Sequence, residues 1–288
     1  MYRIVFVLFI LILVFPVQAQ AQDLSFHEVY QAVHGGVILL SSPGGTCSGW
    51  RYGNVIITNF HCVRRGGPYQ VWHESIGVVD PYGKTVEDKP KPTGKPGDMW
   101  YHWHQEPPEP EGLPATVIGT DSEQDLAILM VQDLPDDIIS LRIADPSTTK
   151  VGDLAFLMGW PLGLWPTFNA GIVSAIDVPF TKFFPQKDNE GMFVADLWVN
   201  GGNSGGPVLN INGEVTGMAC MSLVLNRGIT PTGINLMVNI KHVKHLLATV
   251  IAWGKYSGHF VIVPPVWDIV EEPTIDLPGR GRSDGTPY

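Results

Sequence analysis

The stretch Gly202-Asn203-Ser204-Gly205-Gly206-Pro207 sets a serine in a glycine-rich turn and then opens a strand. Pro207-Val208-Leu209-Asn210-Ile211 has the character of a strand, and Asn212-Gly213 is typical of a two-residue hairpin turn. A phosphate-binding loop is the alternative for such a glycine run. It is disfavoured because no Gly-Lys-Ser/Thr follows and no helical pattern opens after it. The stretch therefore predicts a serine placed just before a β-hairpin.

Two motifs earlier in the chain indicate how this serine is activated. They are Thr58-Asn59-Phe60-His61-Cys62 and Asp125-Leu126-Ala127-Ile128-Leu129. A serine hydroxyl becomes a good nucleophile when an imidazole takes its proton and a carboxylate orients that imidazole. The chain order His, Asp, Ser is that of chymotrypsin-like enzymes, not of α/β-hydrolases or subtilisins. We therefore predict His61, Asp125 and Ser204 as catalytic residues that meet in a cleft between two β-barrels.

The rest of the chain has the pattern of an all-β protein. Short apolar segments separated by Gly, Pro and Asn form two successive groups of about six strands. The first group is expected at 37–42, 46–51, 54–59, 69–73, 115–119 and 126–131, and the second at 154–160, 168–176, 192–199, 207–211, 214–223 and 233–238. This strand count predicts a double barrel.

A helix is expected at each end of the barrels. Ser25, followed three residues later by Glu28, resembles a capping box that opens a short helix ending near His34-Gly35. From Ile240 to Trp253, apolar residues recur at helical spacing, which predicts a C-terminal helix that closes the globule.

Residues 1–21 are predicted to be a secretory signal peptide. Arg3 precedes the apolar run Ile4–Val17, and cleavage is expected after Ala21 or, as the second choice, Ala19. A membrane anchor is the alternative, but 14 residues reach only about 21 Å, short of the roughly 30 Å hydrocarbon core. We therefore expect a secreted or periplasmic protein, with no stable membrane insertion after signal removal.

The remaining organisation is predicted as a first barrel at 22–140, a second barrel with the C-terminal helix at 141–256, and a Pro/Gly-rich tail at 257–288. Residues 75–112 are read as a surface insertion in the first barrel, and the tail is expected to lack a packed core. Within the insertion, His102 and His104 would share one face of a strand. Two histidines without a clear third ligand are insufficient for a metal site, so we predict no metal and no cofactor.

The charge balance argues against a polyanionic partner. The formal net charge is −10 at pH 7, so neither nucleic acid nor an anionic membrane is expected as a standing partner. A protein or peptide substrate is the expected partner, and a homo-oligomer stays open.

The chain contains three cysteines. In an oxidising compartment, Cys47 and Cys62 would link the strand that enters the site to the strand that leaves it. Closing a loop of this length stabilises the fold by about 3 kcal/mol through the entropy of the unfolded chain. Two reduced, buried cysteines are the alternative. Cys220 is left over in an apolar strand, where we expect a buried thiol.

These motifs resemble those of the chymotrypsin-fold (trypsin-like) peptidases, and within them the HtrA/Deg branch. Further matching segments are Gly49-Trp50, Val151-Gly152-Asp153, Met158-Gly159-Trp160-Pro161, Ala170-Gly171-Ile172-Val173-Ser174 and Gly233-Ile234-Asn235-Leu236-Met237-Val238. The resemblance implies two six-stranded antiparallel β-barrels and a serine endopeptidase that cuts exposed or unfolded protein segments. It also implies an oxyanion hole built from the backbone of Gly202, Asn203 and Ser204.

Some positions depart from the HtrA pattern. Phe60 and Cys62 flank His61 where that pattern has Ala and Val, and Cys47 with Cys62 instead resembles the disulfide of digestive trypsin relatives. Asn203 stands where digestive zymogens have an Asp that pairs with a new N-terminus, so activation of that kind is not expected. Too few residues follow Trp253 for a PDZ domain, which needs about 50.

The resemblance also assigns substrate-binding residues. Trp198 occupies the position where an Asp would select Arg or Lys, and Val199 and Leu223 match positions that line the specificity pocket. Such a pocket implies a preference for small or medium apolar residues, with about 1–3 kcal/mol of discrimination per methylene. The alternative is a non-catalytic or partner-activated trypsin-like binding protein. A lipase or esterase is disfavoured, because its serine elbow should open a helix.

Overall fold

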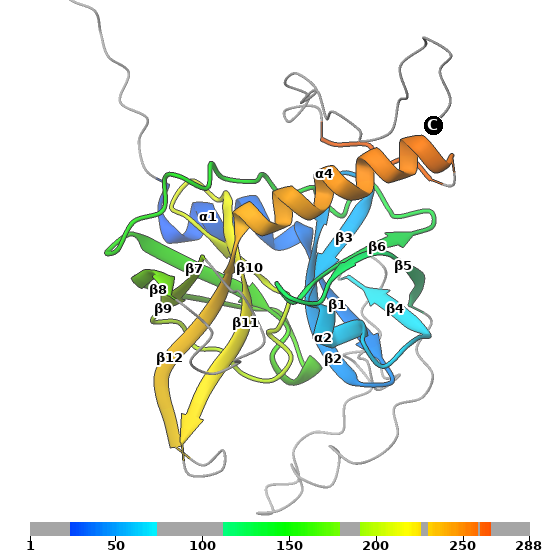
Figure 1. Cartoon of the computed structure of the whole chain (residues 1–288). Helices are drawn as coiled ribbons and strands as arrows, with labels where there is room; N and C mark the ends of the chain where they lie inside the picture. The colour runs from blue at the N-terminus through cyan, green and yellow to red at the C-terminus, as the bar shows by residue number, and fades with distance from the viewer. Residues whose placement is uncertain (1–23, 74–111, 179–190, 226–229, 259, 266–288) are drawn as a thin grey trace, which may run out of the picture.

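The computed structural model describes residues 24–73, 112–178, 191–225, 230–258 and 260–265. Within them, the strands form two closed antiparallel barrels of six strands each (Figure 1), which confirms the predicted fold class. The first barrel contains β1 (Val37–Ser42), β2 (Gly45–Tyr52), β3 (Val55–Thr58), β4 (Tyr69–Trp72), β5 (Leu113–Asp121) and β6 (Leu126–Val131). The second contains β7 (Leu154–Gly159), β8 (Thr167–Val178), β9 (Met192–Ala195), β10 (Pro207–Leu209), β11 (Val215–Leu225) and β12 (Thr230–Asn239).

Both barrels repeat one strand order. The order is β1-β2-β3-β6-β5-β4 around the first barrel and β7-β8-β9-β12-β11-β10 around the second. The barrels close where β1 pairs with β4 and where β7 pairs with β10, so neither sheet keeps a free edge. The strand expected at 192–199 ends at Ala195, because the following residues leave the barrel to form the loop that carries Ser204.

The hairpin after Ser204 has a longer turn than the sequence predicted. Asn210 donates its N–H to the Glu214 carbonyl oxygen at 2.9 Å, so three residues, 211–213, form the loop instead of two. The Asn210 side chain explains the difference, since its Oδ1 accepts the N–H groups of Asn212 and Glu214 at 3.0 Å each. Gly213 takes the positive φ of 74° that a three-residue hairpin loop needs.

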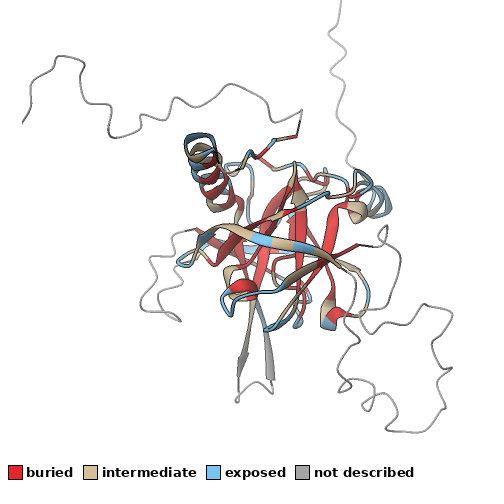
Figure 2. Ribbon diagram, turned by 90° about the vertical axis from the view of Figure 1, so that its right-hand side faces the viewer, coloured by how far each residue is buried: buried red, intermediate tan, exposed pale blue. Residues whose placement is uncertain are grey.

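Buried residues run along the strands and on one side of the helices (Figure 2). Helix α1 (Phe26–Val33) has the predicted capping box, in which Ser25 Oγ accepts the Glu28 N–H and the Ser25 N–H donates to Glu28 Oε2. The pKa of the Glu28 carboxyl group is lowered first by the hydrogen bond that Ser25 Oγ donates to Glu28 Oε2 at 2.6 Å, and further by the one from the Ser25 N–H. The short 3-10 helix η1 (His34–Gly36) then leads into β1. Val29 and Val33 are buried, so α1 is fixed to the barrels by its apolar side.

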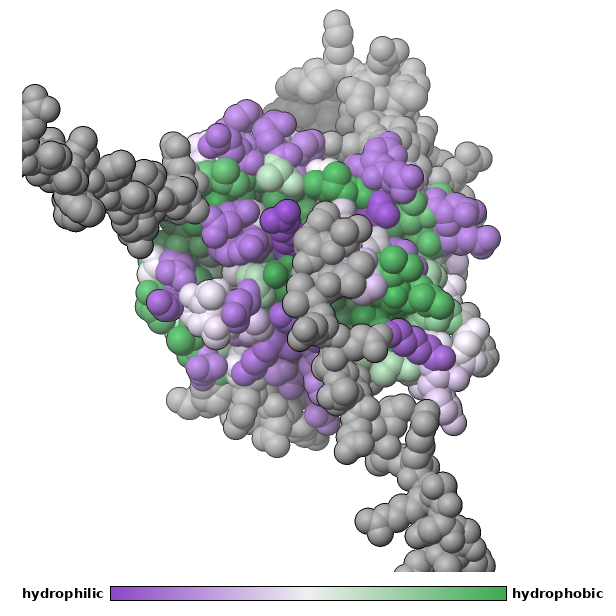
Figure 3. All heavy atoms as spheres, turned by 90° about the horizontal axis from the view of Figure 1, so that it is seen from above, coloured by the Kyte–Doolittle hydropathy of each residue, from purple (hydrophilic) through white to green (hydrophobic). Residues whose placement is uncertain are grey.

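Helix α4 (Ile240–Ser257) connects the two barrels. It begins at Asn239, whose side chain accepts the Lys241 N–H, and ends at Gly258 in the left-handed conformation. Its buried face contacts β5 and β6 of the first barrel and β11 and β12 of the second. Seen from the α4 side, hydrophilic and hydrophobic side chains are interspersed on the surface (Figure 3).

The start of the C-terminal tail packs, contrary to expectation. Ile262 is buried in the core, and Asn54 in the β2–β3 turn exchanges hydrogen bonds of 2.9 Å with the backbone of Val261 and Val263. This pairing supplies the order that the Pro/Gly-rich composition did not indicate. The predicted signal peptide, most of the predicted 75–112 insertion with His102 and His104, and residues 266–288 lie outside the described residues. Within the described residues, no helix is both long and apolar enough to span a membrane.

Phe156 should be essential for stability. Its fully buried ring contacts Phe26 of α1 and Phe168 of β8, with centroids 4.9 and 5.3 Å away. Phe156→Ala should lower the free energy of unfolding by about 3–5 kcal/mol, because it leaves a cavity in the core. Chemical denaturation measures this change. Tyr256→Ala is the control, since Tyr256 is 85% exposed, and should change stability by less than about 0.5 kcal/mol. Equal losses of stability in the two variants would contradict the role of Phe156 in core packing.

Candidate active site

His61 and Asp125 come from neighbouring segments of the first barrel. His61 lies on the one-turn helix α2 (Phe60–Val63), just after β3, and Asp125 lies in the turn before β6. The Asp125 carboxylate contacts His61 twice: Nδ1 of the ring is 2.7 Å from Oδ2, and the main-chain N–H donates to Oδ1 at 2.9 Å. The ring contact favours the tautomer with its proton on Nδ1, which leaves Nε2 as an acceptor.

The backbone of Asp125 has an uncommon conformation, with φ at 57°. Asp tolerates this left-handed region better than most residues, yet it needs support. The Asp125 carbonyl oxygen accepts hydrogen bonds from Asn59 Nδ2 at 2.9 Å and from the Phe60 N–H at 3.0 Å. The residues that precede His61 therefore hold the main chain of Asp125, while its side chain holds the imidazole.

Ser204 comes from the second barrel, in the loop between β9 and β10. It lines one cleft together with His61 and Asp125. Its hydroxyl donates to the Cys220 carbonyl oxygen at 3.3 Å. A serine hydroxyl turns about a single bond, so this donor can be redirected toward an imidazole nitrogen. The structure thus brings the three predicted catalytic residues to one cleft.

Two backbone donors are available beside Ser204. Within the described residues, the N–H groups of Gly202 and Ser204 donate to no partner, whereas the Asn203 N–H donates to the Asn200 carbonyl oxygen at 3.1 Å. Gly202 has a φ of 97°, and a Cβ there would lie 2.4 Å from the Trp160 carbonyl oxygen. Only glycine fits this position. Of the three residues predicted for the oxyanion hole, two therefore offer a free N–H.

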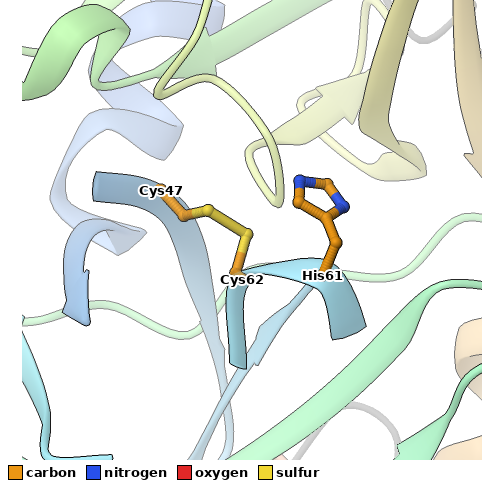
Figure 4. A group of neighbouring side chains, drawn as sticks. All are labelled: Cys47, His61 and Cys62. Atoms are coloured by element: carbon orange, nitrogen blue, oxygen red, sulfur yellow. A yellow bond between two sulfur atoms is a disulfide. The ribbon is translucent and has the colours of Figure 1, made fainter. Parts of the chain in front are cut away.

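Cys47 and Cys62 form the predicted disulfide. It links β2 to the residue that follows His61 and lies beside the imidazole (Figure 4). The two sulfur atoms and one His61 ring nitrogen lie within 4.8 Å of one another, a grouping that could otherwise bind a metal ion. The sulfurs are bonded to each other, so they are not thiolate ligands in this state. Cys220 is buried and outside any disulfide, as expected.

Comparison with known proteins adds to this geometry. The Trypsin-like peptidase domain family matches residues 45–218. The chain belongs to this family. The match includes the predicted nucleophile, base and acid, and also the disulfide.

Individual relatives and structures are similar to parts of this trypsin-like peptidase chain. The periplasmic serine endoprotease DegP of Salmonella typhimurium is 31% identical over 141 residues, which cover 49% of this chain and 28% of DegP. The periplasmic pH-dependent serine endoprotease DegQ of Escherichia coli is 35% identical over 126 residues, 44% of this chain and 27% of DegQ. This chain therefore spans less than a third of either relative. The fold is similar to that of the HtrA-type protease AlgW with tripeptide, with a TM-score of 0.60, 19% identity and coverage of 80% of this chain and 64% of that chain.

The sequence did not reveal one contact of this peptidase site. Cys220 on β11 places its thiol 3.3 Å from Asp125 Oδ2, the same oxygen that His61 Nδ1 contacts. No pattern in the sequence marks this pair, because the two residues are 95 positions apart. A thiol is a weak donor, yet here it faces a carboxylate in a buried setting. One Asp125 carboxylate oxygen is therefore contacted by both His61 and Cys220.

Of the three residues predicted to bind substrate, one lines the cleft and two do not. Val199 lines the cleft. The Trp198 side chain is 79% exposed, and its main-chain N–H donates to Asn169 Oδ1 at 3.1 Å. Leu223 is partly buried against the core.

Further residues that the sequence analysis did not single out also line the cleft. Among them are the apolar Met192 and Met221 and the charged Arg64 and Glu123. The position of Met221, in the strand that returns past Ser204, could have indicated it. The cleft lining therefore includes both apolar and charged side chains.

Replacing Cys220 tests its contact with Asp125. Cys220→Ala removes the donor and should lower kcat by about tenfold. A hydrogen bond to a charged group contributes about 1.5–3 kcal/mol, and a thiol, as a weak donor, contributes near the lower limit of that range. Cys220→Ser keeps a donor and should retain at least wild-type kcat. Steady-state hydrolysis of an unfolded protein substrate and thermal unfolding are measured for both. Equal kcat values for the two variants would show that the thiol does not position Asp125.

Proposed function

We propose that the chain is a serine endopeptidase that hydrolyses peptide bonds in exposed or unfolded protein segments. The observation that carries the proposal is the two-point contact between His61 and Asp125 in the cleft that Ser204 shares. Family membership supports the same reaction class. The periplasmic relatives support a secreted or periplasmic location.

Each residue has a defined role in this reaction. The Ser204 hydroxyl turns from the Cys220 carbonyl oxygen toward His61 Nε2, gives up its proton and attacks the substrate carbonyl carbon. Asp125 keeps Nδ1 protonated and stabilises the imidazolium that forms. The imidazolium then protonates the leaving amine. A water molecule, deprotonated by His61, hydrolyses the acyl-enzyme and releases Ser204.

The developing oxyanion is stabilised by the backbone. The free N–H groups of Gly202 and Ser204 are the donors for this charge, and they act strongly because they are fixed before the reaction begins. The Asn203 N–H, already bonded to Asn200, contributes by holding the loop.

A trypsin-like binding protein without turnover is the second candidate. The observation that favours it is the Ser204 hydroxyl, which is bonded to Cys220 and not to His61. A fluorophosphonate probe separates the two functions, since it labels only a serine that its base activates. Labelling of the mature protein that disappears in Ser204→Ala supports the peptidase. A protein that is folded and not labelled supports the binding protein.

Substitution of the three residues should give unequal losses. Ser204→Ala and His61→Ala should each lower kcat by about 10⁶, because the pair acts as a unit. Asp125→Asn should lower kcat by about 10⁴, because the imidazole then holds the wrong tautomer. Asp121→Asn and Asp133→Asn are the controls and should keep full activity. Loss of activity in either control, with activity kept in Asp125→Asn, would contradict the assignment of the acid.

The cleft should favour apolar residues on the N-terminal side of the cleaved bond. Apolar surface in the cleft is provided by Val199, Met192 and Met221. Position 198, where an Asp would select Arg or Lys, is occupied by Trp. Peptides with Val, Ala or Leu at this position should be cut at least about tenfold faster than peptides with Lys, since the difference in binding exceeds about 1 kcal/mol. Values of kcat/KM over a matched peptide series measure it. A preference for Lys would contradict the proposed pocket.

A further inference from the structure

Ser48 on β2 is a residue of the first barrel that hydrogen-bonds to the Ser204 loop of the second. It is fully buried. Its hydroxyl donates to the Gly202 carbonyl oxygen at 2.7 Å and accepts the Trp160 N–H at 2.8 Å. Its main-chain N–H donates to the Ser204 carbonyl oxygen at 2.7 Å. Each polar group of Ser48 is thus engaged, since its own carbonyl oxygen accepts the Thr58 hydroxyl.

These contacts fall on the peptide units that build the oxyanion hole. In a trans peptide the C=O and N–H groups point in opposite directions, so an anchored carbonyl also fixes where the next N–H points. The carbonyl oxygens accept hydrogen bonds as follows: Gly201 from the Leu162 N–H (2.7 Å), Gly202 from Ser48 Oγ (2.7 Å), Asn203 from the Gly206 N–H (2.9 Å) and Ser204 from the Ser48 N–H (2.7 Å). The peptide anchored by the Ser48 hydroxyl lies between the two that carry the free N–H groups. Its orientation therefore sets the angle between the two donors.

The surroundings hold the Ser48 hydroxyl in place. A Cβ at Gly159 would lie 2.9 Å from Ser48 Oγ, and a Cβ at Gly205 would lie 2.2 Å from the Ser48 carbonyl oxygen. Both positions are glycine, which lets the second barrel approach Ser48 closely. Removing the hydroxyl would leave the Gly202 carbonyl and the Trp160 N–H without this partner in a buried site, at a cost in free energy for each.

We infer that Ser48 is the positioning residue of the oxyanion hole, holding the Gly202–Asn203 peptide so that the Gly202 and Ser204 N–H groups converge on the substrate carbonyl oxygen. Ser48 does not touch the substrate and acts through the loop. The inference rests on the proposed peptidase function. It predicts that loss of the hydroxyl weakens binding of the transition state more than binding of the substrate.

The test compares three variants. Ser48→Ala removes the hydroxyl, and Ser48→Cys keeps a weaker donor. Thr216→Val is the matched control, because Thr216 is also buried and its hydroxyl donates to a main-chain oxygen, that of Val208, in the second barrel away from the cleft. For each protein we would measure kcat, KM, the melting temperature and the affinity for a peptide boronic acid, which forms a tetrahedral adduct with the serine.

The expected result is specific to positioning. Ser48→Ala should lower kcat by about 10- to 100-fold, less than the 10²- to 10³-fold loss on removing an oxyanion donor itself. KM should change by less than about threefold, and the boronic acid should lose affinity in parallel with kcat/KM. Ser48→Cys should lie between Ser48→Ala and wild type. Thr216→Val should lower the melting temperature and leave kcat unchanged.

The other outcomes separate this inference from the proposed function. If wild type is active and Ser48→Ala keeps wild-type kcat with a lower melting temperature, the hydroxyl is only structural, and the inference alone is overturned. If the folded wild-type protein neither turns over substrate nor reacts with a fluorophosphonate, both the proposed peptidase function and the inference about Ser48 are wrong. If Ser48→Ala does not fold, Ser48→Cys decides: a lowered kcat at unchanged KM supports positioning, and a wild-type kcat overturns it.

Discussion

The hydrogen bond from the Ser48 N–H to the Ser204 carbonyl oxygen, 2.7 Å long, joins the two barrels where the candidate catalytic groups meet. His61 and Asp125 belong to the first barrel and Ser204 to the second. Neither barrel holds all three residues, so the approach of Ser204 to His61 depends on how the barrels dock. Helix α4 reinforces this docking, because its buried face packs on strands of both barrels.

Local constraints then fix His61 within the first barrel. The disulfide ties the residue after His61 to β2, while Asn59 and Phe60 before it hold the carbonyl group of Asp125. The positive φ of Asp125 persists only because its surroundings determine it. Since those surroundings include Asn59 and Phe60, which precede His61, the segments that carry Asp125 and His61 order one another.

Sequence patterns were sufficient to predict the structure where it depends on residues that are close together in the chain. The capping box at Ser25, the strand groups and the helix after Asn239 depend on local chemistry, and three ordered motifs marked the candidate site. Contacts across the fold gave no such signal. Ser48 lies 154 positions from Gly202, and the Cys220 contact with Asp125 depends on the approach of β11. The exposed Trp198 shows the same limit, since family position alone did not place its side chain.

The loop that carries Ser204 is held by hydrogen bonds between neutral groups. The neutral Asn203 side chain fits this arrangement, because it needs no buried cation as a partner. The Asn203 side chain is 1% exposed, and its amide donates to the Trp198 carbonyl oxygen at 3.3 Å. An Asp at this buried position would require a cation, because an unpaired buried charge is costly. Asn removes that requirement, and the carbonyl groups on either side are held by hydrogen bonds from Ser48 and from main-chain N–H groups. The shape of the loop that carries Ser204 therefore depends on hydrogen bonds and close packing between the barrels, and not on an ion pair of residue 203.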